Sequence, residues 1–376
     1  MQDDIVSAVL AREEVARYLR GEGGEPPAVV RARIERYLDE LKTTQRYPIY
    51  RALRHPLQPV FRRITPIAEG LEAVDAAVAA GRVVYVSNHK SHLDYLVEPL
   101  VLDDHGVRAP VIAAGINLFA GPLALLHRHV TGAIPVRRNA RDPAYLATLK
   151  AYVAELLRRH DLLFYIEGGR SYTGELKPPK TGLLHAALLA DTRVLFVPVA
   201  VAYDLVLEDR ILARQAERRR PLAFSRELAE MIRYGIGYRS RAFVCFGTPL
   251  SAEGHDPASR RDVLQLARTI RDAIGRLYKV LPTALVAAAM RPSMSRGELE
   301  DRVGALLDSL AGRGANLAVD SAREAVATGT AQLVERDVLV AERGRFRVRR
   351  RLVLRYYART IEHLIAGRGG AGRASG

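Results

Sequence analysis

Apolar and polar positions alternate in blocks along the chain, and the blocks predict short buried strands separated by amphipathic helices. Residues 83–86 are β-branched or aromatic without polar interruption, which is typical of a buried strand. Helical spacing appears between such runs, as in residues 142–160. The alternation predicts an α/β fold, with a mixed or largely parallel sheet flanked by helices. Further strand-like runs are APVIAAG (109–115), GAIPVRR (132–138), LLFYIEGG (162–169), RVLFVPVAVAY (193–203) and AFVCFGTPL (242–250).

The two ends of the chain have a different pattern from its middle. Up to residue 70 the spacing is helical, with a breaker, GEGGEPP, at 21–27. After residue 286, helical patterns precede a basic hairpin that turns near Gly344, an order that is winged-helix-like and often binds DNA. The charge-dense stretch 207–224 is predicted to be an exposed excursion. We therefore expect a division into 1–70 (N-terminal helical region), 71–286 (the α/β domain), 287–366 (C-terminal helical and hairpin region) and 367–376 (disordered tail).

The net charge of +15, from 57 Lys and Arg against 42 Asp and Glu, indicates a polyanionic partner. That partner could be nucleic acid, an anionic membrane surface or a phosphorylated substrate. The single cysteine, Cys245, lies in an apolar run and is expected to be a buried, inert thiol in a reducing compartment.

We expect neither a secretory signal nor a membrane span. The chain opens with the acidic MQDDIVSAVL, and the longest apolar run, 110–126, is too short to cross a bilayer and contains two prolines. That run and the basic, apolar residues 46–64 are the surfaces we expect to lie on an anionic membrane.

The first chemical motif, HKSHLD, directly follows the strand at 83–86. On one continuous helix His89 and Asp94 would be about 140° apart, so they meet only if His89 lies in a turn and Asp94 in the first helical turn. There the aspartate can orient the imidazole while the other nitrogen takes a proton, as in a Ser-His-Asp triad. Ser91 can cap that helix. His92 leaves a metal cluster open, although no third ligand run is close by.

Three further clusters follow strand-like runs. FYIEGGRSYTG places Glu167, Gly168, Gly169 and Arg170 behind a strand, where glycines permit close backbone approach and arginine suits phosphate. Lys177 and Lys180 follow in the same loop, and GAIPVRR ends in Arg137 and Arg138. VPVAVAYD is a strand interrupted by Pro198, which marks an edge, a bulge or a pocket wall.

Taken in order, these four clusters resemble the blocks of the glycerol-3-phosphate and dihydroxyacetone-phosphate acyltransferase family. The blocks are HKSHLD, GAIPVRR, FYIEGGRSYTG and VPVAVAYD, with AAGINL between the first two and FGTPL downstream. The C-terminal YYARTIEHLI looks like the end of the bacterial membrane-associated glycerol-3-phosphate acyltransferase, a longer protein. The resemblance covers about residues 60–366.

The resemblance implies acyl transfer from a fatty acyl thioester, of coenzyme A or acyl carrier protein, to the sn-1 hydroxyl of glycerol-3-phosphate. This is the first step of phospholipid synthesis. His89 would be the general base and Asp94 its orienting partner. The resemblance also implies acceptor-binding residues, an oxyanion held by amides near the two glycines, and neither a cofactor, a metal nor a covalent acyl-enzyme. The acceptor-binding residues are Arg138, Glu167, Gly168, Arg170, Lys180 and Pro198.

Several alternatives stay open at this point. The acceptor could be dihydroxyacetone phosphate or 1-acylglycerol-3-phosphate, because Pro135 and Tyr172 depart from the family pattern, which has an aromatic residue and often a second arginine at these positions. Residues 290–366 could bind DNA, or could be a structural appendage, which we favour. A catalytically dead lipid-binding relative is the third possibility. We expect a peripheral protein at the cytoplasmic face of the membrane.

Overall fold

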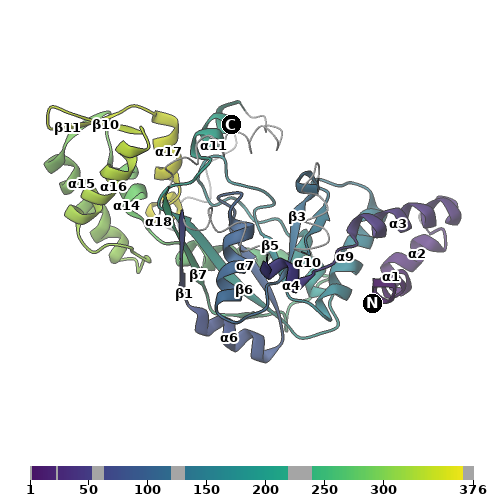
Figure 1. Ribbon diagram of the computed structural model, residues 1–376. Helices are drawn as coiled ribbons and strands as arrows, with labels where there is room; N and C mark the ends of the chain where they lie inside the picture. The colour runs from purple at the N-terminus through teal and green to yellow at the C-terminus, as the bar shows by residue number, and fades with distance from the viewer. Residues whose placement is uncertain (1, 23, 53–62, 120–131, 219–238, 367–376) are drawn as a thin grey trace.

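The computed structural model describes residues 2–22, 24–52, 63–119, 132–218 and 239–366. A mixed β-sheet with helices packed around it forms the core (Figure 1). The strand order is β1-β7-β6-β2-β5-β3-β4, and β8 pairs with β6. This confirms the predicted α/β fold and each strand predicted from the sequence. The bounds are β1 Ile64–Glu69, β2 Arg82–Ser87, β3 Val111–Gly115, β4 Ile134–Val136, β5 Leu162–Tyr165, β6 Val194–Tyr203, β7 Ser240–Phe246 and β8 Leu250–Ser251.

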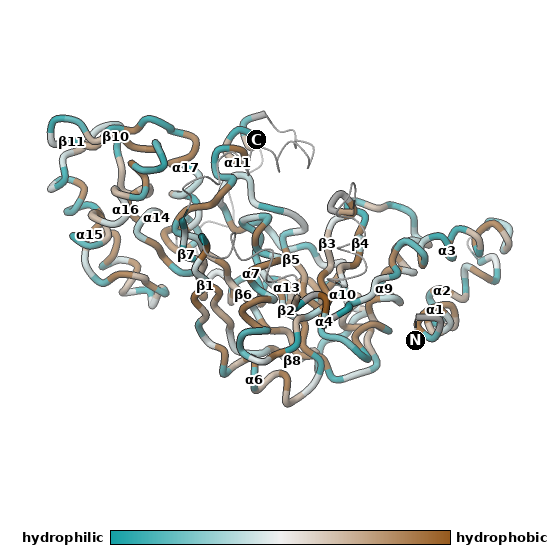
Figure 2. Tube along the Cα trace, viewed as in Figure 1, coloured by the Kyte–Doolittle hydropathy of each residue, from teal (hydrophilic) through white to brown (hydrophobic). Residues whose placement is uncertain are grey.

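Strand direction determines where the loops after the strands meet. β2 is parallel to β5 and β6, β3 is parallel to β4 and β5, and β7 runs antiparallel to β6. The carboxyl ends of β2 to β6 therefore share one edge of the sheet. All of β6 is buried, as expected for strands covered on both faces. Figure 2 shows hydrophobic residues concentrated along the strands.

The helical spacing predicted at 142–160 is confirmed by α9 (Pro143–Leu157). In the N-terminal region and the sheet domain the helices are α1 Gln2–Ala11, α2 Glu13–Leu19, α3 Pro27–Leu41, α4 Tyr47–Ala52, α6 Leu71–Ala80, α7 Asp94–Asp104, η1 Ile116–Phe119, α9 Pro143–Leu157, α10 Gly182–Leu188, α11 Asp209–Arg218 and α13 Arg260–Leu277. The C-terminal helices are α14 Pro282–Ala289, α15 Arg296–Ala311, α16 Ala322–Glu335, α17 Arg351–Arg359 and α18 Glu362–Ile365.

Two sequence-based predictions about the sheet are corrected. Residues 64–69, predicted as part of the N-terminal helical region, form β1 and pair in parallel with β7. Pro198 does not mark an edge, because β6 lies inside the sheet. It stands where the antiparallel neighbour of β6 changes from β8 to β7, so its missing N–H interrupts neither ladder.

The C-terminal region has the element order of a winged helix. α14, β9 (Ser293–Ser295), α15, α16, β10 (Leu339–Glu342) and β11 (Arg345–Val348) follow in sequence, and the strands pair in the order β10-β11-β9. Ser295 and Glu298 form a capping box at α15. The predicted hairpin turns at Arg343 and Gly344, both with positive φ, as a two-residue turn requires.

The charge-dense stretch 207–224 is not an exposed excursion where the structure describes it. Glu208 and Asp209 are almost fully buried, and so are Ile211 and Leu212 on α11. Residues 219–224 lie outside the described part, as do 120–126 of the apolar run, 53–62 of the basic segment and the tail 367–376. Cys245 is buried, as predicted. Among the described helices, none is both long and apolar enough to cross a bilayer.

Candidate active site

His89 and Asp94 lie at the carboxyl edge of the sheet, where β2 gives way to α7. β2 ends at Ser87 and α7 begins at Asp94, so the pair meets across the turn as the spacing predicts. The imidazole Nδ1 is 2.8 Å from the Asp94 Oδ2. Ser91 does not cap the helix, since the N-cap position is Leu93; instead its hydroxyl accepts a hydrogen bond from the Leu93 N–H within the turn.

Asp94 is fully buried, and both of its oxygens are hydrogen-bonded. Oδ2 accepts from the N–H groups of Lys90 (2.7 Å) and Ser91 (3.0 Å), and Oδ1 accepts from the Tyr203 hydroxyl (2.7 Å). Burial raises the pKa of Asp94 to about 6, against these hydrogen bonds, which lower it. At neutral pH the group is therefore a carboxylate. Because a carboxylate only accepts, the proton of the His89 ring is assigned to Nδ1, and Nε2 is the basic nitrogen.

The His89 ring stacks on an aromatic side chain and has several positively charged groups nearby. It stacks on Tyr165, with ring centroids 4.0 Å apart and planes inclined by 12°. Burial holds the pKa of His89 well below its usual value, and neighbouring positive groups lower it further: Arg170, His92, Arg138 and Lys177. No described residue hydrogen-bonds Nε2. A neutral imidazole with an available Nε2 can accept a proton from a bound hydroxyl.

Glu167 ties the histidine turn to the glycine loop after β5. One carboxylate oxygen accepts from the His89 N–H at 3.0 Å, and the other accepts from the Lys177 N–H at 3.2 Å. The Ser171 N–H donates to the His89 carbonyl at 2.9 Å. The backbone around the imidazole is thus fixed from both sides.

The two glycines of the loop differ in what their amides do. The Gly168 N–H donates to the Tyr165 carbonyl at 3.0 Å, and Gly168 has a φ of +68°, so it closes a turn that favours glycine. Its amide is therefore already engaged. In the described part of the chain no group accepts from the Gly169 N–H, which leaves that amide as the candidate oxyanion donor.

Two of the predicted cations, Arg170 and Lys180, belong to this loop, and Arg138 reaches it from the end of β4. Arg138, exposed after β4, lies against two glycines: a Cβ at Gly115 would come 3.0 Å from its Nε, and one at Gly169 3.4 Å from its Cζ. Lys180 is exposed and lies over Gly168. Arg170 is nearly buried and has its Nη1 3.5 Å from a Glu208 oxygen. The loops after β4 and β5 therefore supply positive charge next to His89.

Tyr203, Glu208 and Lys90 belong to the site although the sequence analysis did not select them. The buried Lys90 ammonium donates to the Gly174 and Glu175 carbonyls at 2.6 and 3.3 Å. Tyr203 lies at the end of the fourth block, so its place in that motif could have identified it as a site residue. Glu208 gave the opposite signal, because charge density suggested exposure.

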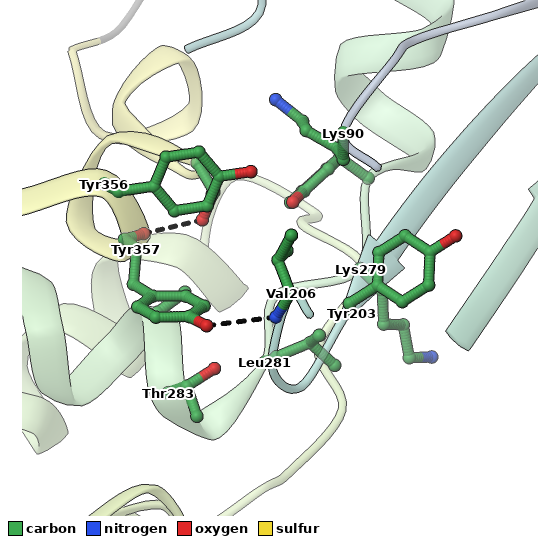
Figure 3. Close-up of a pocket in the computed structure, with 11 residues that line it drawn as sticks. Lys90, Tyr203, Val206, Lys279, Leu281, Thr283, Tyr356 and Tyr357 are labelled. Atoms are coloured by element: carbon green, nitrogen blue, oxygen red, sulfur yellow. Dashed lines mark hydrogen bonds between the residues drawn. The ribbon is translucent and has the colours of Figure 1, made fainter. Parts of the chain in front are cut away.

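A small cavity separates Lys90 and Tyr203 from the C-terminal helix α17. Figure 3 shows Lys90 on one side of it and Tyr356 and Tyr357 on the other, with the Tyr357 hydroxyl bonded to the Val206 N–H at 3.0 Å. Helix α17 therefore faces Lys90 and Tyr203 across this cavity.

Two other predicted features have their positions fixed by the fold. His92 donates its N–H to Glu208 at 2.6 Å. Among the described residues, no group of three or more His, Cys, Asp and Glu side chains is arranged to share a metal ion. Pro198 is buried beside Val86 of β2, and its carbonyl accepts from the Gly247 N–H. Its role as a pocket wall stays a prediction.

Residues 67–202 match the family model described as Acyltransferase. These 136 residues are less than half of the chain. The match runs from β1 to β6 and includes His89, Asp94, Arg138 and the loop 167–170. The match agrees with the acyltransferase resemblance of the four sequence blocks, of which the first three lie wholly within the matched residues.

Curated proteins similar to this chain carry the name glycerol-3-phosphate acyltransferase. The one from Xanthomonas campestris is 30% identical over 263 residues, which cover 66% of this chain and 29% of that protein. The one from Aeromonas hydrophila is 30% identical over 312 residues, covering 73% and 38%. The chain thus spans less than half the length of these relatives. A crystal structure of a 1-acyl-sn-glycerophosphate acyltransferase from Thermotoga maritima aligns with 14% identity and a TM-score of 0.36, over 73% of this chain and 96% of that one.

Proposed function

We propose that this protein transfers a fatty acyl group from a thioester to the sn-1 hydroxyl of glycerol-3-phosphate, giving 1-acylglycerol-3-phosphate. The observation that carries the proposal is the His89–Asp94 pair, whose Nε2 is available beside a cluster of cations. The family match and the names of the similar proteins support the reaction class and the acceptor.

In this mechanism His89 is the general base. The acceptor hydroxyl gives its proton to Nε2 while its oxygen attacks the thioester carbonyl carbon, forming a C–O bond. Asp94 holds the imidazole in position and stabilises the imidazolium. The oxyanion is held by an amide such as that of Gly169. The C–S bond then breaks, and the imidazolium returns the proton to the departing thiolate, so no covalent acyl-enzyme forms.

The cations hold the acceptor phosphate. Arg138 is exposed at the mouth of the site and offers a planar fork of donors, which suits bidentate phosphate binding. Lys180 adds a point charge from the neighbouring loop. Arg170 lies deeper and is already paired with Glu208, so we assign it to the inner edge of the phosphate pocket.

The test measures acyl transfer from palmitoyl-CoA, and separately from a palmitoyl acyl carrier protein, to radiolabelled glycerol-3-phosphate. We expect product with one or both donors, and a fall in kcat of at least about 10³-fold in His89→Ala with an unchanged circular dichroism spectrum. A His89→Ala variant that keeps the wild-type rate would refute the mechanism.

Parallel reactions with dihydroxyacetone phosphate and 1-acylglycerol-3-phosphate test the acceptor. We expect the highest kcat/KM for glycerol-3-phosphate. A higher kcat/KM for either alternative would make that compound the proposed acceptor. The absence of product with all acceptors and both donors would favour a non-catalytic relative.

We further propose a peripheral location on an anionic membrane, because the product and the acyl chain are hydrophobic and the net charge is +15. The measurement is co-sedimentation with vesicles of phosphatidylglycerol and phosphatidylcholine. We expect binding that weakens as salt rises. An absence of binding to anionic vesicles at low salt would contradict this location.

A further inference from the structure

Glu208 is a buried carboxylate that contacts both the histidine turn and Arg170 of the glycine loop. It lies between the end of β6 and the start of α11, and its side chain is fully shielded from solvent. One oxygen accepts from the His92 N–H at 2.6 Å and lies 3.5 Å from the Arg170 Nη1. The other accepts from the Ser91 hydroxyl at 2.9 Å. A single side chain thus joins the turn that carries the general base to an arginine of the glycine loop.

The charge of Glu208 matters because Arg170 is itself almost buried. A buried guanidinium needs a carboxylate to neutralise its charge. Because the guanidinium is planar, the position of that carboxylate also determines where the other N–H groups point. Arg170 also lies over the Tyr172 ring, with its Cζ 5.9 Å from the centroid. Where the family pattern often has a second arginine, this chain has an aromatic ring, so Glu208 and Tyr172 together hold one inner cation.

We propose that Glu208 is a positioning residue that aims Arg170 at the acceptor phosphate and fixes the distance between that phosphate and His89. This inference rests on the proposed transfer to a phosphorylated acceptor. Glu208 itself touches no reacting atom. Its removal should therefore weaken acceptor binding much more than thioester binding.

The adjacent carboxylate provides a matched control. Asp209 is equally buried but faces the C-terminal region, where it pairs with Arg336 at 2.8 Å and accepts from the Tyr357 hydroxyl at 2.8 Å. Asp209→Asn breaks a buried ion pair of similar kind without touching the site. It reports what loss of stability alone does to the kinetics.

The experiment measures kcat, the acceptor KM and the thioester KM for wild type, Glu208→Gln and Asp209→Asn, with thermal unfolding of each. We expect Glu208→Gln to raise the acceptor KM by about tenfold, the scale of one charge-assisted hydrogen bond, and to leave the thioester KM within about twofold. Asp209→Asn should lower the Tm and leave both KM values near wild type. An unchanged acceptor KM in Glu208→Gln, or an equal rise in Asp209→Asn, would overturn the inference.

A double-mutant cycle tests whether Glu208 acts through Arg170. If it does, adding Glu208→Gln to Arg170→Gln should raise the acceptor KM no further, whereas independent roles would multiply the two effects. Glu208→Asp keeps the charge but retracts it by one methylene, and should raise the acceptor KM by a smaller factor. It replaces Glu208→Gln if that variant does not fold. Wild-type protein inactive with every acceptor would instead refute the proposed function on which the inference rests.

Discussion

Tyr203 and Asp94 show how much of the chemistry depends on single hydrogen bonds. The Asp94 carboxylate is buried, and each donor that reaches it favours its ionised form. Lys90 contributes its backbone N–H and a nearby positive charge. Glu98, one turn further along α7, is also buried, and burial raises its pKa well above the usual value. These donors therefore help to keep Asp94 of the His89–Asp94 pair ionised at neutral pH.

The activity of the wild type should fall as pH drops through about 6. Asp94 must be ionised to orient His89, and it becomes protonated below its pKa of about 6, whereas burial holds the pKa of the imidazole well below its usual value. Tyr203→Phe removes one donor that lowers the Asp94 pKa, so the acid limb should shift to higher pH. The measurement is kcat/KM against pH. An acid limb at the same pH in both proteins would contradict this assignment.

Arg138 and Arg137 are neighbours in sequence with different environments. Arg137 donates to Glu40 of α3 at 2.8 Å, and its Cζ lies 4.9 and 5.1 Å from the ring centroids of Tyr37 and Tyr145. Arg138→Ala should raise the acceptor KM by about tenfold with little change in kcat, because it removes phosphate binding. Arg137→Ala is the control and should leave the acceptor KM near wild type. Steady-state kinetics decide between them, and equal effects would remove the assigned role of Arg138.

At the scale of elements, the site depends on how closely strand ends approach one another. β3 ends in Gly115 and the loop after β5 contains Gly169, and the Arg138 guanidinium lies against both glycines. Gly174, further along the loop after β5, has a φ of +89°, and a Cβ there would lie 2.1 Å from the Tyr356 carbonyl oxygen. The glycines in the family blocks therefore serve close packing as well as ligand approach.

Gly115→Ala tests this packing. A methyl group at the end of β3 would stand about 3.0 Å from the Arg138 guanidinium and displace that flexible group, not the backbone. We expect a several-fold rise in the acceptor KM, smaller than in Arg138→Ala, with a Tm close to wild type. In the Arg138→Ala background the same substitution should have no further effect on KM. Additive effects would show that Gly115 acts by another route.

At the scale of the whole molecule, the C-terminal region is docked onto the acyltransferase domain through buried charge. Arg336 pairs with Asp209 and donates to the Leu207 carbonyl at 2.6 Å, and Arg359 of α17 pairs with Glu175 of the glycine loop. The hairpin arginines Arg345 and Arg347 are paired with carboxylates on the surface. These contacts favour the structural appendage over the DNA-binding alternative.

Arg336→Met should destabilise the protein by about 3–5 kcal/mol, because it leaves Asp209 buried without its partner. Arg345→Ala, which removes an exposed ion pair with Glu298, should leave the unfolding free energy close to that of the wild type. Urea unfolding of both variants gives the comparison. Similar unfolding free energies would mean that the C-terminal region is not held by this pair.

The sequence by itself determined strands β2 to β7, the order of the blocks and the His89–Asp94 pair. Strand periodicity and the spacing of one turn are local properties, so they can be predicted without knowing what lies across the sheet. The family resemblance added the cations at 138, 170 and 180 in the same way, block by block.

Only the tertiary structure decided which of these residues lie close together and which groups neutralise the buried charges. Glu208, Tyr203 and Lys90 belong to the site because loops after different strands converge at one edge of the sheet. Glu208 and Asp209 are buried although their sequence is charge-dense, since each finds a partner more than 30 residues away. The strand at 64–69 was likewise missed, because it exists through its pairing with β7. Pairing between residues far apart in the sequence cannot be predicted from local sequence patterns.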